Sequence, residues 1–105
     1  MSPSLGRKES NVLGDVFRAL ADPTRRAIIR SLRKRDMTAG ELGEISSLAP
    51  STLSSHFRIL REAGLIEAER QGTSIVYSLN ISAVEETVGA VMELLHVGAD
   101  QKESK

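Results

Sequence analysis

The sequence predicts a mainly α-helical domain with one small β-hairpin, in the order of four helices, the hairpin and a last helix. Apolar residues recur at helical spacing through most of the chain. The pattern becomes extended only in the two runs that flank Gln71-Gly72-Thr73-Ser74. A capped helix, a tight turn and a second helix come directly before those runs. The predicted order is therefore helix, turn, helix and a hairpin wing.

Length and composition exclude several classes of protein. At 105 residues the chain is long enough for one domain with a small core. It has no cysteine, which excludes disulfides, thiolate metal sites and thiol redox switching. No apolar run approaches the ~20 residues that cross a bilayer, and no apolar segment follows the basic residues near the N-terminus. We therefore expect a cytoplasmic protein without membrane insertion.

The first two helices are predicted from periodicity and capping. Residues 1–10 are polar and are expected to form a disordered tail before a domain at 11–98, and a polar tail follows at 99–105. From Asn11 onward, apolar residues follow the spacing of a helix. Asp22-Pro23 then predicts an N-cap followed by proline at the first position of the second helix.

A short third helix is predicted after Asp36. Thr38 and Glu41 have the spacing of a capping box, in which each side chain accepts a hydrogen bond from the backbone of the other. Leu42 and Ile45 are expected on the inner face of this helix.

The fourth helix, from Pro50 to Gly64, has two chemically different faces. At 100° per residue, one face carries small hydroxyls and a cation, and the opposite face is apolar. The first face holds Ser51, Ser54, Ser55 and Arg58, and the second holds Leu53, Phe57 and Leu60. Short hydroxyls permit close approach to base edges, and Arg58 is then within reach of a phosphate or a guanine. The alternative is a solvated helix that happens to be rich in serine.

Charge is unevenly distributed along the chain, although the formal net charge is zero. Residues 1–70 hold 12 Lys and Arg against 9 Asp and Glu, whereas residues 71–105 hold 2 against 5. Six of the cations lie in one segment: Arg25, Arg26, Arg30, Arg33, Lys34 and Arg35. Such a run is either a solvated helix face or a source of contacts to DNA phosphates.

The C-terminal part predicts a hairpin and an apolar helix. Strands are expected at Leu65–Arg70 and Ile75–Leu79, and Asn80 or Ser82 is expected to cap the last helix. That helix carries one apolar stripe of Val84, Val88, Val91 and Leu95. A chain of this size forms only a small core, so we expect the stripe to pack against a second subunit. The alternative is that the stripe packs within its own chain.

Three segments together resemble the ArsR/SmtB-type winged helix-turn-helix repressors, in particular members that lack metal-ligand cysteines. They are residues 17–26 (FRALADPTRR), residues 51–65 (STLSSHFRILREAGL) and the wing with Gly72 and Tyr77-Ser78-Leu79. The resemblance implies a homodimeric transcriptional repressor that binds double-stranded DNA at an inverted-repeat operator. It also implies a recognition helix in the major groove and a wing that touches the backbone or the minor groove.

The resemblance assigns roles to positions of this chain. The implied base contacts come from Pro50, Ser51, Ser54 and Ser55. The implied supporting or phosphate contacts come from Thr38, Thr52, His56 and Arg58, and the implied wing contacts from Gln71 and Thr73. The implied dimer interface comprises Leu13, Val16 and Phe17 of the first helix and Val84, Val88, Val91 and Leu95 of the last.

The chain departs from the family pattern in two respects: the residues that bind metal in some members, and the N-cap residue of the fourth helix. The third helix has no cysteine where some members bind metal, and the last helix has Asn80, Ser82 and Ala83 in place of paired Asp and His ligands. Glu93 and His96 alone are too few for a tight site. We therefore expect no metal and no cofactor, and an unidentified protein or small molecule as the inducer. Ala49 stands where the family often has a serine N-cap, which leaves backbone N–H groups free at the start of the fourth helix.

The leading hypothesis is a metal-independent repressor, and the resemblance to members without metal ligands implies that it represses its own gene. One alternative is a metal- or small-molecule-responsive repressor on the same fold. Another is a winged-helix module that binds a protein partner. An enzyme is not expected, since the chain has no cysteine nucleophile, no phosphate-binding glycine loop and no credible Ser-His-acid arrangement.

Overall fold

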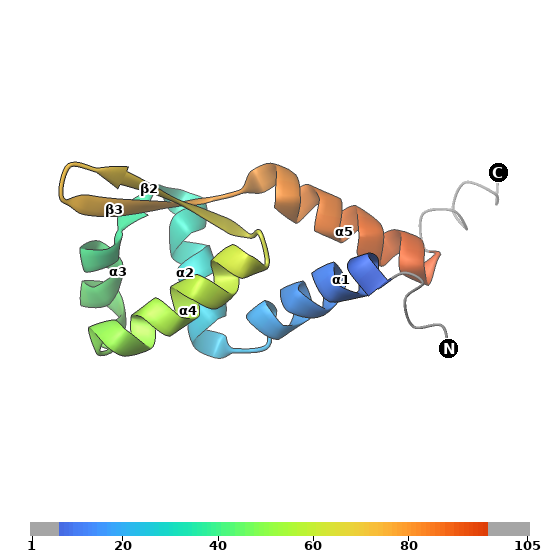
Figure 1. Ribbon diagram of the computed structural model, residues 1–105, viewed down its shortest axis with the longest axis horizontal. Coiled ribbons are helices and arrows are strands. Elements are labelled where there is room, and N and C mark those ends of the chain that lie inside the picture. Colours follow the sequence, from blue (N-terminus) through green and yellow to red (C-terminus); the bar gives the residue numbers. More distant parts are fainter. Residues whose placement is uncertain (1–6, 97–105) are drawn as a thin grey trace.

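The computed structural model describes residues 7–96, which form five α-helices and a three-stranded antiparallel sheet (Figure 1). The helices are α1 (Arg7–Leu20), α2 (Pro23–Lys34), α3 (Ala39–Ser46), α4 (Pro50–Glu62) and α5 (Ile81–Leu95). The strands are β1 (Met37–Thr38), β2 (Ile66–Gln71) and β3 (Ser74–Leu79). This order confirms the predicted mainly helical class with a hairpin between the fourth and last helices.

The sheet contains one strand more than the sequence predicts. The strand order is β1-β3-β2, and β1 joins the hairpin by pairing Met37 with Tyr77 and Thr38 with Val76. A strand of two residues is too short to show any alternation of its own, so nothing local marks it. Its pairing connects the start of α3 to the middle of β3.

The core lies where α1, α2, α3 and α4 meet the sheet. It is built mainly from aliphatic side chains, and Phe57 and Tyr77 stack across it with ring centroids 4.3 Å apart. The prediction that Ile45 faces inward is wrong, because this side chain is 60% exposed whereas Leu42 is 2% exposed. The short helix α3 packs against the core through the Leu42 side alone.

The N-terminal boundary also differs from the prediction. Helix α1 begins at Arg7, so residues 7–10, which we expected in a disordered tail, are helical. Arg7, Lys8 and Glu9 are good helix formers, and they extend the helix outward from the apolar turns that anchor it. Residues 1–6 and 97–105, with the rest of the predicted tails, lie outside the described residues.

Helices α1 and α5 extend together beyond the rest of the molecule (Figure 1). Side chains of both helices, among them Leu13, Ala90 and Leu94, line a groove between them. The opposite side of α5 is apolar and exposed, with Ile81 at 54%, Val88 at 52% and Leu95 at 63%. Helix α5 contains no fully buried side chain among its described residues. These two helices therefore leave apolar surface uncovered within one chain.

Candidate nucleic-acid interface

The start of α4 is open on its outer side. Pro50 occupies the first helical position, and Ala49 provides no side-chain hydrogen bond as N-cap. The backbone N–H groups of the first turn lack partners within the helix, and they form the positive end of the helix dipole. This end can therefore accept an anion such as a DNA phosphate.

The two faces of α4 are divided as predicted. Leu53, Phe57 and Leu60 are 3%, 4% and 0% exposed and anchor the helix to the core. The outer face is exposed from the first turn through the middle of the helix, at Pro50, Ser51, Thr52, Ser54, Ser55 and Arg58. We call these six residues the α4 outer face. Its short side chains leave the helix backbone accessible to a flat or grooved partner.

Arg58 is engaged in a weak ion pair on this face. Its Nη1 lies 3.9 Å from Oε2 of Glu62, one turn further along α4, and both side chains are more than half exposed. An exposed pair of this kind contributes little to stability. Arg58 is therefore free to exchange Glu62 for a phosphate or a base.

Thr38 holds the start of α3. Its hydroxyl accepts a hydrogen bond from the Glu41 N–H at 3.0 Å, and the Glu41 carboxylate accepts one from the Thr38 N–H at 2.9 Å. This confirms the predicted capping box. The hydrogen bond from the Thr38 backbone, with help from the charge of Arg35, lowers the pKa of the Glu41 carboxyl below its ordinary value. The Thr38 hydroxyl is thus already committed to the helix end.

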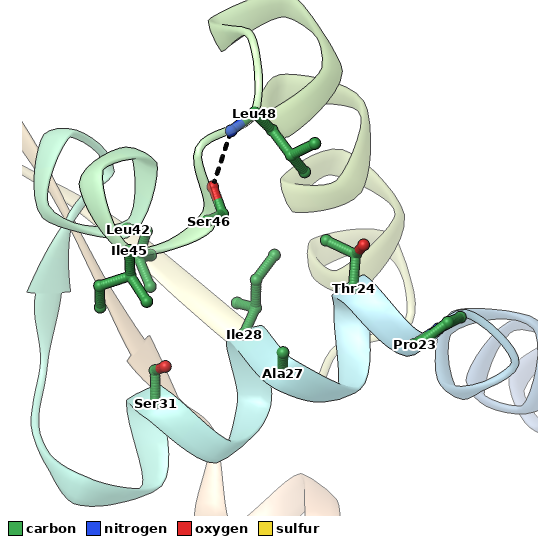
Figure 2. Close-up of a pocket in the computed structure, with 9 residues that line it drawn as sticks. All are labelled: Pro23, Thr24, Ala27, Ile28, Ser31, Leu42, Ile45, Ser46 and Leu48. Carbon is green, nitrogen blue, oxygen red and sulfur yellow. Dashed lines mark hydrogen bonds between the residues drawn. The ribbon is translucent and has the colours of Figure 1, made fainter.

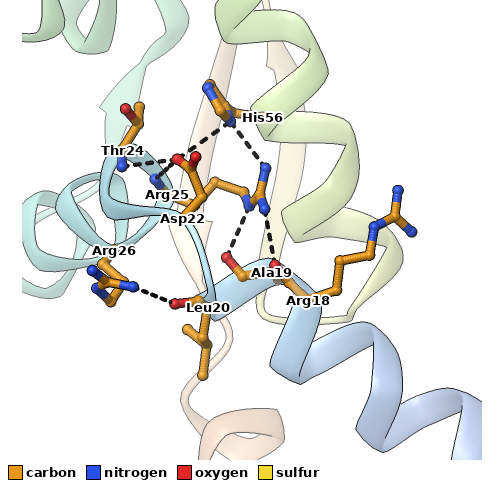
Figure 3. Close-up of polar contacts among 8 residues, drawn as sticks. All are labelled: Arg18, Ala19, Leu20, Asp22, Thr24, Arg25, Arg26 and His56. Carbon is orange, nitrogen blue, oxygen red and sulfur yellow. Dashed lines mark hydrogen bonds and ion pairs between the residues drawn. The ribbon is translucent and has the colours of Figure 1, made fainter.

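His56 does not belong to the α4 outer face. Its ring is half-buried behind that face, with Nδ1 3.2 Å from Nη1 of Arg25 and 3.9 Å from Oδ2 of Asp22 (Figure 3). His56 is therefore held within the helix-turn-helix motif, by contacts to the first turn of α2 and its N-cap. In the sequence, Arg25 is recognisable as one of the basic residues of α2 and not as a buried one. Its spacing of three and seven residues from the buried Ile28 and Leu32 is the signal that could have placed it on the inner face.

Asp22 caps α2 as predicted, and its carboxylate accepts hydrogen bonds from the N–H groups of Thr24 and Arg25 at 2.8 and 3.2 Å. Desolvation alone would raise the pKa of this carboxyl. The two backbone hydrogen bonds, together with the nearby positive charge of Arg25, outweigh it, so the pKa is lowered below 3.8.

We expect Asp22→Asn to reduce the loss of stability in acid. The folded-state pKa is lowered, so the carboxylate stabilises the fold above the ordinary pKa, and this contribution is lost as the pH falls through the folded-state value. Asparagine still caps a helix but does not titrate. Urea unfolding at several pH values between about 5 and 2 should show a shallower decline for the variant. Equal slopes for the variant and the parent would contradict this role of Asp22.

The wing tip is exposed and tightly turned. Gln71 pairs with Ser74 at the end of the hairpin, and Gly72 adopts a φ of +63° in the turn between them. Gln71 and Thr73 are both exposed there, as expected for wing contacts. Positive φ at Gly72 favours glycine, which explains its place in the turn.

A groove of about 290 Å³ lies between α2 and α3 (Figure 2). Its lining is mostly apolar, with the hydroxyls of Thr24, Ser31 and Ser46 as its polar side-chain groups. The Ser46 hydroxyl already accepts a hydrogen bond from the Leu48 N–H at 3.3 Å. The nine lining residues offer no charged group to an ionic ligand.

Within residues 7–96, no three His, Asp or Glu side chains gather as a metal ion would require. In the same part of the chain, no helix has the length and hydropathy to span a bilayer.

The residues of the implied dimer interface divide into two groups. Phe17, Val88 and Leu95 are exposed, and Leu13, Val84 and Val91 are partly exposed. Val16 is 1% exposed and belongs to the core of its own chain, so it has no surface left for a partner. Sequence reasoning missed Ile81 and Met92, which extend the exposed stripe of α5 along the same side.

Comparison with known proteins agrees with this architecture. Residues 22–68, which run from the cap of α2 into the wing, match the family model of bacterial regulatory proteins of the arsR family. The chain is 35% identical to the transcriptional repressor SdpR of Bacillus subtilis over 86 residues, which cover 82% of this chain and 96% of the relative.

Solved structures give the same result. An ArsR-like transcriptional regulator from Rhodococcus sp. RHA1 superposes with a TM-score of 0.76 at 25% identity, covering 92% of this chain and 91% of that one. NolR from Sinorhizobium fredii superposes with a TM-score of 0.68 at 32% identity, covering 90% and 93%. The winged helix-turn-helix geometry and the 35% identity to a curated repressor lead to one conclusion. The chain belongs to the ArsR family of DNA-binding transcriptional regulators.

Proposed function

We propose that this regulator is a homodimeric, metal-independent repressor that binds an inverted-repeat operator in the cytoplasm. The observation that carries the proposal is the α4 outer face, where small exposed hydroxyls lie opposite side chains that are locked in the core. Such a helix can enter the major groove without its own side chains keeping the backbone away from the bases.

Within this face, Pro50, Ser51, Ser54 and Ser55 make the base contacts. Thr52 and the free N–H groups at the start of α4 hold phosphates, and Arg58 holds a phosphate or a guanine. Gln71 and Thr73 of the wing contact the DNA backbone or the minor groove. Thr38 and His56 act indirectly, by holding the helices in place: the hydroxyl of Thr38 caps α3, and the half-buried ring of His56 lies against the start of α2.

The proposed dimer seam is formed by the uncovered apolar surface of α1 and α5. We define the seam by its exposed or partly exposed apolar residues: Leu13, Phe17, Ile81, Val84, Val88, Val91, Met92 and Leu95. Two seams that pack together remove this surface from water and place two copies of α4 in one assembly. A symmetric pair of recognition helices matches an inverted repeat.

Metal independence is supported by the residues of α3 and α5. The segment Glu41–Ile45 has no thiolate, and the single pair of Glu93 and His96 supplies two potential ligands where a tight site takes about four. The signal that releases DNA is then a protein or a small molecule. A metal-responsive repressor on the same fold and a protein-binding winged helix are the competing functions, and the following experiment distinguishes them.

We expect gel shifts on the DNA upstream of the protein's own gene to be the same with zinc, nickel or a chelator. Without a complete ligand set, a metal has no differential affinity for the DNA-bound and free states, and therefore does not change DNA affinity. Random DNA of the same length serves as the control.

A change of about tenfold or more with metal, equal to about 1.4 kcal/mol of coupling, would show that the protein is a metal sensor. Equal binding of upstream and random DNA, or no binding of either at low salt, would favour the protein-binding alternative.

A further inference from the structure

Arg25 is the charged side chain that the structure buries. Among the described residues it is the one buried polar or charged residue, at 9% exposed, and it lies in the first turn of α2 on the same face as Ile28 and Leu32. A buried guanidinium is costly to desolvate unless each of its polar atoms has a partner. The positions of those partners show what Arg25 connects.

Two of its nitrogens bind the end of α1. Nε donates to the carbonyl oxygen of Ala19 at 2.8 Å, and Nη2 donates to that of Arg18 at 2.8 Å (Figure 3). These carbonyls lie in the last turn of α1, at the negative end of the helix dipole, and that of Arg18 also accepts a hydrogen bond from the Ala21 N–H at 3.2 Å. The guanidinium therefore fixes the end of α1 to the start of α2.

The third nitrogen reaches the middle of α4. Nη1 lies 3.2 Å from Nδ1 of His56, which is the neighbour of Ser55 on the α4 outer face and of Phe57 in the core. Asp22 supplies the opposite charge, with Oδ2 3.9 Å from the same ring nitrogen. One planar side chain thus connects three helices in a geometry that the single ammonium of lysine cannot reproduce.

We infer that Arg25 is a positioning residue for operator recognition, which acts through His56 to set the orientation of α4 relative to α1. This inference rests on the proposed function, in which α1 contributes to the dimer seam and α4 enters the groove. Because α1 is part of the seam, its angle to α4 decides how far apart the two recognition helices lie. Arg25 therefore determines which spacing of half-sites the dimer accepts.

Arg26 provides a matched control. It is the next residue of α2, and its Nη1 donates to the carbonyl oxygen of Leu20 at 2.7 Å, so it also caps α1. Its side chain is exposed, and the carbonyl to which it donates lies on α1 and not on α4. Arg26→Lys therefore tests the cap on α1 without changing the connection to α4.

The first experiment tests the orientation of α4 relative to α1 in the absence of DNA, by measuring a distance between the two helices. Since the chain has no cysteine, Gly14→Cys in α1 and Thr52→Cys in α4 give two unique sites for spin labels. A Cβ at Gly14 meets no side chain beyond its chain neighbours and no other element within 4 Å, and Thr52 is exposed. Double electron–electron resonance, on labelled chains diluted with unlabelled protein, then reports the distance between α1 and α4 within one chain.

We expect Arg25→Lys and His56→Leu to broaden or shift this distance distribution while circular dichroism still shows a folded, helical protein. Arg26→Lys should retain the parent distribution. His56→Asn should also retain it, because the asparagine amide oxygen can take the place of Nδ1 as the acceptor for Arg25. Parent-like distributions for both Arg25→Lys and His56→Leu would overturn the inference, whether or not the parent binds DNA.

The second experiment measures half-site spacing on the upstream DNA that the parent protects. Arg25→Lys and His56→Leu should lose about tenfold in affinity for the natural site, and lose most of the parent's discrimination against a site with one base pair inserted between the half-sites. If His56→Leu instead weakens binding to both sites equally and leaves the spin-label distance unchanged, His56 contacts DNA directly and the positioning role is wrong. If the parent binds no DNA, the proposed function fails, and the distance measurement still decides the role of Arg25 in the fold.

Discussion

Val88→Glu is expected to convert the protein to a monomer and to abolish tight operator binding. Val88 is 52% exposed in the middle of the α5 stripe and takes no part in the core of its own chain. A glutamate there would be buried without a partner in the dimer seam, at a cost that dissociation avoids. The monomer should remain helical, since the substitution leaves the core unchanged.

Sedimentation and gel shifts test this expectation together. A monomer contacts only one half-site, so operator binding should weaken by about 100-fold or more, because the two recognition helices no longer bind as one unit. Ile45→Glu is the matched control for sedimentation, since it also introduces a glutamate at an exposed isoleucine, 60% exposed on α3 and away from the seam. A dimer of Val88→Glu would show that the interface lies elsewhere.

Ser54→Ala and Ser55→Ala are expected to reduce discrimination between operator and random DNA. Both hydroxyls are exposed on the α4 outer face, so their removal leaves the fold intact. Each lost base contact should cost about 1–3 kcal/mol on the operator, with little change in the dependence on salt. Competition gel shifts with operator and random fragments at several salt concentrations measure both quantities.

Arg58→Ala shows whether Arg58 contacts a phosphate or a base. If Arg58 holds a phosphate, binding should weaken on every sequence, and the salt slope should become shallower by about 0.9 for each subunit. If it binds a guanine, specificity should relax at one operator position. Arg61→Ala is the control, because Arg61 is exposed near the C-terminal end of α4, about two turns beyond Ser54 and away from the end that enters the groove.

The outcome for these variants decides the role of α4. If all three variants bind the operator as tightly as the parent does, α4 is not the recognition helix. These variants are Ser54→Ala, Ser55→Ala and Arg58→Ala. The protein-binding winged helix would then become the leading function.

The features that the sequence determined by itself are those decided within a few residues. Asp22 caps α2, Thr38 and Glu41 form the capping box of α3, and Asn80 caps α5, each through hydrogen bonds that span two or three residues. The ends of helices follow from such local donors and acceptors. The periodicity of α4 likewise separated its serine face from its core face, since both follow from the geometry of a single helix.

The tertiary structure decided what depends on distant segments. Strand β1 exists because Met37 meets Tyr77 forty residues later in the chain, and Ile45 is exposed because it borders the open groove between α2 and α3. Arg25 appears in the sequence as one cation in a basic run, but its partners lie on α1 and α4. Helical periodicity places a residue on a face, whereas burial and pairing depend on which element packs against that face, and this is decided only when the chain folds.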